Sequence, residues 1–117
     1  MKNYLAVFMV SPAAMDEWMK QPEEVRKPKD MEGMQAWMKW AEDHKASIMN
    51  MGGPLGKTKV VNKNGISDIR NEMGAFSIVT AASHEEAAKM FENHPHFMIF
   101  PGDRVEVVEI GEIPKMN

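Results

Sequence analysis

The stretch Asn3-Tyr-Leu-Ala-Val-Phe-Met-Val10 decides the fold of this 117-residue chain. Alternate side chains of a β-strand point to opposite faces of its sheet. One face here carries Tyr4, Ala6, Phe8 and Val10, and the other carries Leu5, Val7 and Met9. Because both sets are apolar, the stretch predicts a strand buried on both sides.

The residues after this strand carry two helix signals. Ser11 as an N-cap and Pro12 in the first turn predict a short helix that runs to about Lys20. Helical spacing returns from about Asp30 to Met49, and Gly52-Gly53-Pro54 ends that second helix and predicts a turn or extended backbone. Its predicted buried stripe comprises Met34, Trp37, Met38, Ala41, Lys45 and Ile48.

The second half of the chain predicts a hairpin, two further strands and a helix. Residues 55–62 and a return to about residue 70 form a hairpin with its turn at Asn64-Gly65. Residues 74–81 form a strand, and Ser83 with Glu86 forms a capping box that opens a helix. Pro95 ends that helix or the turn after it. Residues 104–110 form the last strand.

This order of elements predicts the fold class. It is the split βαββαβ pattern of an α+β, ferredoxin-like domain, with an antiparallel sheet and helices on one face. At 117 residues, the whole chain from 1 to 117 is expected to be one domain.

The doubly apolar first strand has a consequence for assembly. Helices cover only one sheet face, and no residues remain to cover the other. A second copy of the chain is the simplest cover, which predicts a homodimer. A bent sheet that closes on itself is the alternative.

Composition excludes several classes of protein. The chain has 14 basic and 17 acidic residues and no basic block, so nucleic-acid binding is not expected. It has no cysteine, which fits a reducing, cytoplasmic location. The apolar run Tyr4–Val10 is too short for a membrane span and at the lower limit for a secretory signal, so neither is expected.

Two segments resemble a known family. Met51-Gly-Gly-Pro-Leu-Gly-Lys-Thr-Lys59 is similar to the Asp-Gly-Pro-Phe-x-x-Thr-Lys segment that names the DGPF group. Glu86-Ala87-Ala88 through Asn93-His94-Pro95, followed by a valine-rich strand, resembles the C-terminal half of YCII-related proteins. The resemblance implies a small bacterial protein that forms a dimeric α/β barrel of ferredoxin-like units.

The chain departs from the family pattern at the residues suggested there for catalysis. The family carries a histidine on the long helix and an aspartate just after the last helix. Here His94 occupies the aspartate position, and the helical position, near Gln35 to Trp37, has no histidine. Gly52 also replaces the aspartate of the Asp-Gly-Pro-Phe segment. The pair is therefore not carried over to this chain.

His94-Pro95-His96 is the densest group of reactive side chains, and it leads to our prediction of catalytic residues. In extended backbone the two imidazoles project to one side, where they could act as base and orienting group, with Asp103 supplying a carboxylate. The alternative is structural: His94 caps the end of a helix and His96 forms a hydrogen bond. Two ligands are too few for a metal site, and scattered methionines indicate gap-filling, so no metal or cofactor is expected.

Aromatic and glycine residues suggest where a ligand would bind. Trp18 and Trp40, the latter one turn before His44, could stack against a ring-shaped substrate. Core packing is the alternative and is favoured for Trp37. Gly53 and Pro54 follow a glycine whose backbone N–H could approach an anion, although a simple turn explains them too.

Three hypotheses of function follow. The first is a cofactor-free enzyme that uses histidine acid/base chemistry on a small organic molecule, in an isomerisation, elimination or lyase-type reaction. The second is a non-catalytic ligand-binding or regulatory module, which the resemblance links to sigma-factor sequences and transcription control. The third is a protein whose dimer is its main role.

Overall fold

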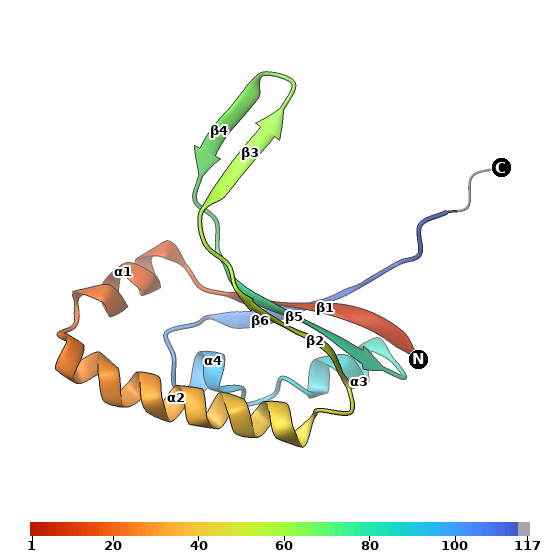
Figure 1. The fold of residues 1–117 in the computed structure, drawn as a ribbon, viewed down its shortest axis with the longest axis horizontal. Coiled ribbons are helices and arrows are strands. Elements are labelled where there is room, and N and C mark those ends of the chain that lie inside the picture. The colour runs from red at the N-terminus through yellow and green to blue at the C-terminus, as the bar shows by residue number, and fades with distance from the viewer. Residues whose placement is uncertain (115–117) are drawn as a thin grey trace.

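The fold is seen in a computed structural model that describes residues 1–114 (Figure 1). Its helices are α1 (Pro12–Lys20), α2 (Glu23–Asp43), α3 (His84–Lys89) and α4 (Pro95–Met98). Its strands are β1 (Lys2–Met9), β2 (Ile48–Pro54), β3 (Thr58–Asn62), β4 (Gly65–Ile69), β5 (Met73–Ala81) and β6 (Arg104–Glu109).

Four of the strands form one sheet in the order β2-β5-β1-β6, in which β1 is central and antiparallel to both neighbours. The helices α2, α3 and α4 lie on one side of this sheet (Figure 1). Strands β3 and β4 form a separate two-stranded hairpin between β2 and β5. The predicted α+β, ferredoxin-like fold is therefore confirmed, with the hairpin as an addition to it.

The core lies between the sheet and the helices. Tyr4, Ala6 and Phe8 of β1 are buried there together with Val79 of β5 and Phe91. On the opposite face, Val7 is 8 % exposed while its neighbours Leu5 and Met9 are half-buried. The predicted division of β1 into two apolar faces is confirmed, and the second face carries no helix.

The long helix differs from its prediction in both position and buried face. It begins at Glu23, contains Pro28 in its first turns and ends at Asp43. Its buried residues are Gly33 and Trp40, whereas Met34 and Met38 are 54 % and 68 % exposed. The predicted stripe is right at Trp37, Ala41 and Ile48, which pack against the core, and wrong at Met34 and Met38. The buried face includes a glycine instead: Phe100 packs on Gly33 so closely that a Cβ would collide with its ring. Apolar spacing does not detect a glycine as a buried position.

Residues 52–54 do not end a helix but belong to β2, which pairs with β5. The pairing is interrupted by irregularities on either side of Asn50. Gly52 has a φ of 67° and lies so close to the Phe76 carbonyl that no side chain would fit. A glycine in this conformation is what a bulged strand requires. Of the two predicted alternatives, extended backbone is therefore the one that forms, with a bulge at the glycines.

The local sequence signals predicted the starts of helices α1 and α3 and the position of the hairpin turn correctly. The side chain of Ser11 accepts a hydrogen bond from the Ala14 N–H, and that of Ser83 accepts one from the Glu86 N–H, as the N-cap signals predict. The hairpin also turns at the predicted place, between Asn62 and Gly65. Helix α3 is shorter than expected, however, because it ends at Lys89 and a new short helix begins at Pro95.

Candidate functional site

A cluster of packed rings lies between β1, α2 and the segment that joins α3 to α4. We call it the aromatic–histidine cluster; its members are Phe8, Trp37, Trp40, Phe91, His94 and His96. The ring of His94 lies 4.5 Å from that of Trp37 and 4.7 Å from that of Trp40, nearly perpendicular to the first. The cluster is therefore a packed part of the core around an imidazole.

His94 is fully buried and holds the start of α4. Its Nδ1 accepts a hydrogen bond of 3.0 Å from the backbone N–H of His96, so the neutral ring carries its proton on Nε2. Burial, with smaller effects of His96 and His44, lowers the pKa of His94 to about 3. His94 is thus a neutral N-cap of the next helix, not the cap at the end of the previous one.

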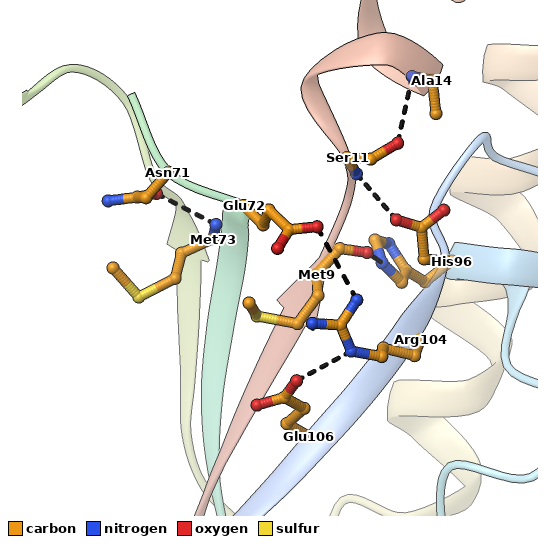
Figure 2. A network of polar contacts seen from close by, with 10 residues as sticks. Met9, Ser11, Ala14, Asn71, Glu72, Met73, His96, Arg104 and Glu106 are labelled. Carbon is orange, nitrogen blue, oxygen red and sulfur yellow. Dashed lines mark hydrogen bonds and ion pairs between the residues drawn. The ribbon is translucent and has the colours of Figure 1, made fainter. Parts of the chain in front are cut away.

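His96 follows in the first turn of α4, so the pair does not lie in extended backbone as predicted. Its Nε2 lies 2.8 Å from the Met9 carbonyl, to which it donates a hydrogen bond (Figure 2). Burial lowers the pKa of His96, while the Met9 carbonyl and the charge of Asp103 oppose that shift. The ring is packed so tightly that a side chain at Gly102 would collide with it.

Asp103 comes directly before β6 and remains exposed. Its Oδ2 accepts a hydrogen bond of 2.8 Å from the Ser11 backbone N–H, which orients the carboxylate and leaves the other oxygen free of hydrogen bonds within the described residues. Beside it, Arg104 donates to Glu106 at 2.7 Å and pairs with Glu72 at 3.9 Å (Figure 2). An oriented carboxylate therefore stands beside a guanidinium already engaged by two acids.

An open cleft of about 420 Å³ lies between α3 and β6, and we call it the β6 cleft. It is lined by Ala88, Phe91, Phe97, Val105 and Val107 and by the ionisable residues His84, Glu92, Asp103 and Arg104. The His84 ring stacks on Tyr4 at 5.1 Å, and its Nε2 lies 2.7 Å from the Val107 carbonyl. A mostly apolar cleft with a few placed polar groups is the usual form of a small-molecule site.

The predicted site residues fall into four places. His94, His96, Trp40 and His44 come together in or beside the aromatic–histidine cluster, with the His44 ring 5.1 Å from that of Trp40. Asp103 lines the β6 cleft. Trp18 lies half-buried on α1, and Gly53 and Pro54 lie on β2, at the edge of the sheet opposite β6. The structure therefore does not bring all the predicted residues into one site.

Trp40, the candidate for stacking on a ligand, is a core residue. It is 7 % exposed, and its Nε1 donates a hydrogen bond of 2.7 Å to the Met90 carbonyl. Trp37, for which core packing was favoured, is the less buried of the two and packs against Phe8 at 4.7 Å. Both tryptophans therefore pack within the aromatic–histidine cluster.

The sequence did not point to three ionisable residues of the β6 cleft: His84, Glu92 and Arg104. His84 directly follows Ser83 in the N-cap motif of α3, so the residues around it were interpreted as a helix start and not as part of a site. Glu92 lies beyond the end of α3, next to Asn93, whose φ is 57°. A helical wheel that extends α3 past Lys89 assigns Glu92 to the wrong face. No local signal in the sequence predicted that the helix would end there.

Two further properties bear on the chemistry. Within residues 1–114, no three His, Cys, Asp or Glu side chains come together as ligands for a metal ion. No helix in the same range has both the length and the apolar character needed to cross a membrane.

Comparisons with known proteins identify the fold. No protein-family model and no curated protein sequence matches the chain. Among solved structures, it is similar to the 5-chloro-2-hydroxyhydroquinone dehydrochlorinase of Burkholderia phenoliruptrix AC1100, in complex with 2,5-dihydroxybenzoquinone. The two are 22 % identical with a TM-score of 0.53, over 98 % of this chain and 95 % of the other. At this identity the likeness concerns the α+β fold that the two chains share over nearly their whole lengths.

Proposed function

We propose that this protein is a cofactor-free enzyme that binds a small, ring-shaped organic molecule in the β6 cleft and transfers a proton on it. The observation that carries the proposal is the position of Asp103, an oriented carboxylate at an apolar cleft. A positioned carboxylate can take a proton from a bound molecule, and apolar walls favour the binding of a planar ring.

The histidines take different roles in this proposal. His94 is buried, its Nδ1 is engaged in the cap of α4, and its pKa lies near 3, so we assign it to positioning. His96 is fixed by the Met9 carbonyl, and its own carbonyl accepts a hydrogen bond of 3.0 Å from the Gly102 N–H, so we assign it to holding the segment that carries Asp103. Asp103 is the residue we assign to proton transfer.

The reaction class we favour is an elimination. The dehydrochlorinase of similar fold acts on a chlorinated hydroxyhydroquinone, and removal of hydrogen chloride requires a base to accept the proton. Isomerisation and lyase-type reactions need the same proton transfer and are included in the proposal. The fold and the two motifs also support placing the chain among the YCII-related proteins.

A binding module without catalysis is the second candidate. The observation in its favour is that both histidines of the aromatic–histidine cluster are buried and hydrogen-bonded to backbone groups. A ligand in the β6 cleft would then contact only Asp103, Glu92, His84 and Arg104 as ionisable groups. Such a module would bind its ligand with the same affinity whether or not Asp103 can accept a proton.

We also propose that a second copy covers the sheet face that has no helix. We call it the open face; it is formed by Leu5 and Val7 of β1, Phe76 and Ile78 of β5, and Val108 of β6. Leu5 stands directly between Ile78 and Val108 across the two strand pairs. An apolar face of this kind is typical of an interface between identical subunits.

The enzyme proposal is tested by Asp103→Asn. Asparagine retains an oxygen that can accept the Ser11 N–H but cannot take a proton, so binding should persist while proton transfer is lost. The assay is chloride release from 5-chloro-2-hydroxyhydroquinone, followed beside binding of 2,5-dihydroxybenzoquinone by calorimetry. Removal of a general base typically lowers the rate by about 10²–10⁴-fold.

The matched control is Glu32→Gln, which removes a carboxylate from the exposed surface of α2. It should leave binding and chloride release unchanged. Equal chloride release by Asp103→Asn and the unmodified protein would contradict the assignment of Asp103. Binding of the quinone without any chloride release in either protein would favour the non-catalytic module.

A further inference from the structure

The β3–β4 hairpin is far more exposed than the rest of the chain. Every residue of β4 is exposed, and the two strands pack chiefly on each other. Val61 and Ile66 face each other across the hairpin and are 73 % and 70 % exposed. An isolated two-stranded hairpin is only marginally stable in water, so an exposed apolar pair on one indicates a partner surface.

The position of the hairpin indicates where that partner lies. In Figure 1 the hairpin rises on the side of the sheet away from α2, which is the side of the open face. Its base is tied to α1 by an ion pair of 2.9 Å between Arg70 and Asp16. A groove of about 890 Å³, with Leu55, Ile69 and Met73 in its lining, lies at this base. A molecule seated on the open face would therefore also meet the hairpin.

Charge identifies the partner as a second copy of the chain. Residues 55–70 contain the bases Lys57, Lys59, Lys63 and Arg70 and the single acid Asp68. Residues 84–112 contain seven acids and only two bases, Lys89 and Arg104. The basic hairpin thus complements the acidic segment of α3 and β6, and both belong to one chain, as a two-fold interface requires.

Two residues stand out as the contact. Lys63 lies at the tip of the hairpin, between β3 and β4, and Glu92 lies at the β6 cleft. Neither forms an ion pair within residues 1–114. Lys57 is unpaired too but lies at the base of the hairpin, before β3, and the unpaired Glu85, Glu86 and Glu112 do not line the β6 cleft. Strand β6 is an edge of the sheet, so its outer side is open to a neighbour.

We propose that the β3–β4 hairpin is a dimer arm that lies along the β6 edge of a second copy and brings Lys63 to Glu92 at that copy's β6 cleft. The arm then places an ammonium group beside the cleft, which suits a ligand that carries an anionic oxygen. By symmetry each copy gives one arm and receives one. The inference rests on the proposed homodimer and the proposed cleft.

A charge exchange between chains tests the arm. Lys63→Glu and Glu92→Lys each place like charges at both contacts of the dimer, so each variant alone should dimerise about tenfold more weakly. Mixed together, the two variants restore opposite charges at both contacts of a heterodimer. Sedimentation velocity of the separate and mixed variants is expected to show recovery of the dimer only in the mixture.

Lys29→Glu is the matched control, since it reverses an exposed lysine on α2, on the other side of the sheet. It should dimerise as the unmodified protein does, alone and in mixtures. The proposal is overturned if both variants dimerise normally, if the mixture is no better than either variant, or if the unmodified protein is a monomer. Binding of 2,5-dihydroxybenzoquinone to the unmodified protein separates this failure from failure of the cleft, because the cleft exists within one chain.

Discussion

The aromatic–histidine cluster and the β6 cleft lie on two sides of one side chain, Phe91, and differ in every property that matters for chemistry. Phe91 is 4 % exposed; its ring lies 5.9 Å from that of His94, and it also lines the cleft. On the cluster side the imidazole is sealed and neutral. On the cleft side the carboxylates of Glu92 and Asp103 are exposed.

The difference teaches that burial decides the role of these residues. An imidazole that is removed from water, and whose Nδ1 is already engaged, gains little by taking a proton and is a poor base at neutral pH. An exposed and oriented carboxylate can contact a ligand in the cleft. The densest group of reactive residues in the sequence is therefore the structural one, and a lone aspartate beside it is the candidate for chemistry.

Removal of the ring between the two regions should have the largest effect. Phe91→Ala opens a cavity in the core, for which a loss of about 3–5 kcal/mol in the free energy of unfolding is expected. Water that enters from the cleft would reduce the burial of His94 and raise its pKa from about 3 toward 6.5. Urea unfolding measures the first effect, and an NMR titration of the His94 ring measures the second.

Phe97→Ala provides the control, because Phe97 is half-buried and lines the cleft. It should cost less stability and leave the pKa of His94 low. A low His94 pKa in a folded Phe91→Ala variant would show that the ring is not what separates the two regions.

A smaller effect is expected for the pH dependence of stability. In the folded chain the pKa of His94 is about 3, below the unfolded value near 6.5, so the unfolded chain takes up a proton first as the pH falls. The stabilisation is complete above about pH 6.5 and is lost from there toward pH 3. Between pH 7 and pH 5 the loss from this residue should be about 2 kcal/mol.

His94→Asn isolates this contribution. Asparagine is a good N-cap and can accept the same backbone N–H, but it does not titrate in this range. Urea unfolding at pH 7, 6 and 5 measures the free energy of unfolding of both proteins. Between pH 7 and pH 5 the variant should lose about 2 kcal/mol less than the unmodified protein, whatever the stability of the variant at pH 7. If both proteins lose stability equally between pH 7 and pH 5, then His94 is not a sealed neutral group.

Much of the fold follows from local signals in the sequence. The alternation in residues 3–10, the serine caps at Ser11 and Ser83, and the turn at Asn64-Gly65 each depend on near neighbours, and the structure agrees with each. The errors arose where a distant contact decides. Gly33 is buried only because Phe100 packs on it, and position 52 needs a glycine because the Phe76 carbonyl of the paired strand β5 lies beside it. Sequence spacing carries no record of such partners.

The site could be predicted only in part for the same reason. His94, His96 and Asp103 are close in sequence, and their region is indeed the place where core and cleft meet. Which of them is sealed depends on Trp37, Trp40 and Phe8, which come from other elements. The partners of Asp103 in the cleft are likewise distant: His84 begins α3, and Val107 lies on β6.

The central claim is that the β6 cleft, and not the aromatic–histidine cluster, receives a small ring-shaped ligand. A ¹H–¹⁵N correlation titration of the protein with 2,5-dihydroxybenzoquinone tests it most directly. We predict the largest shifts at the amides of Ala88, Val105 and Val107, which line the cleft only. Little change is expected at Trp37 and Trp40 of the cluster, or at Leu55 and Ile69 in the groove beside the hairpin. Shifts confined to that groove, or no saturable shift at the cleft, would contradict the account.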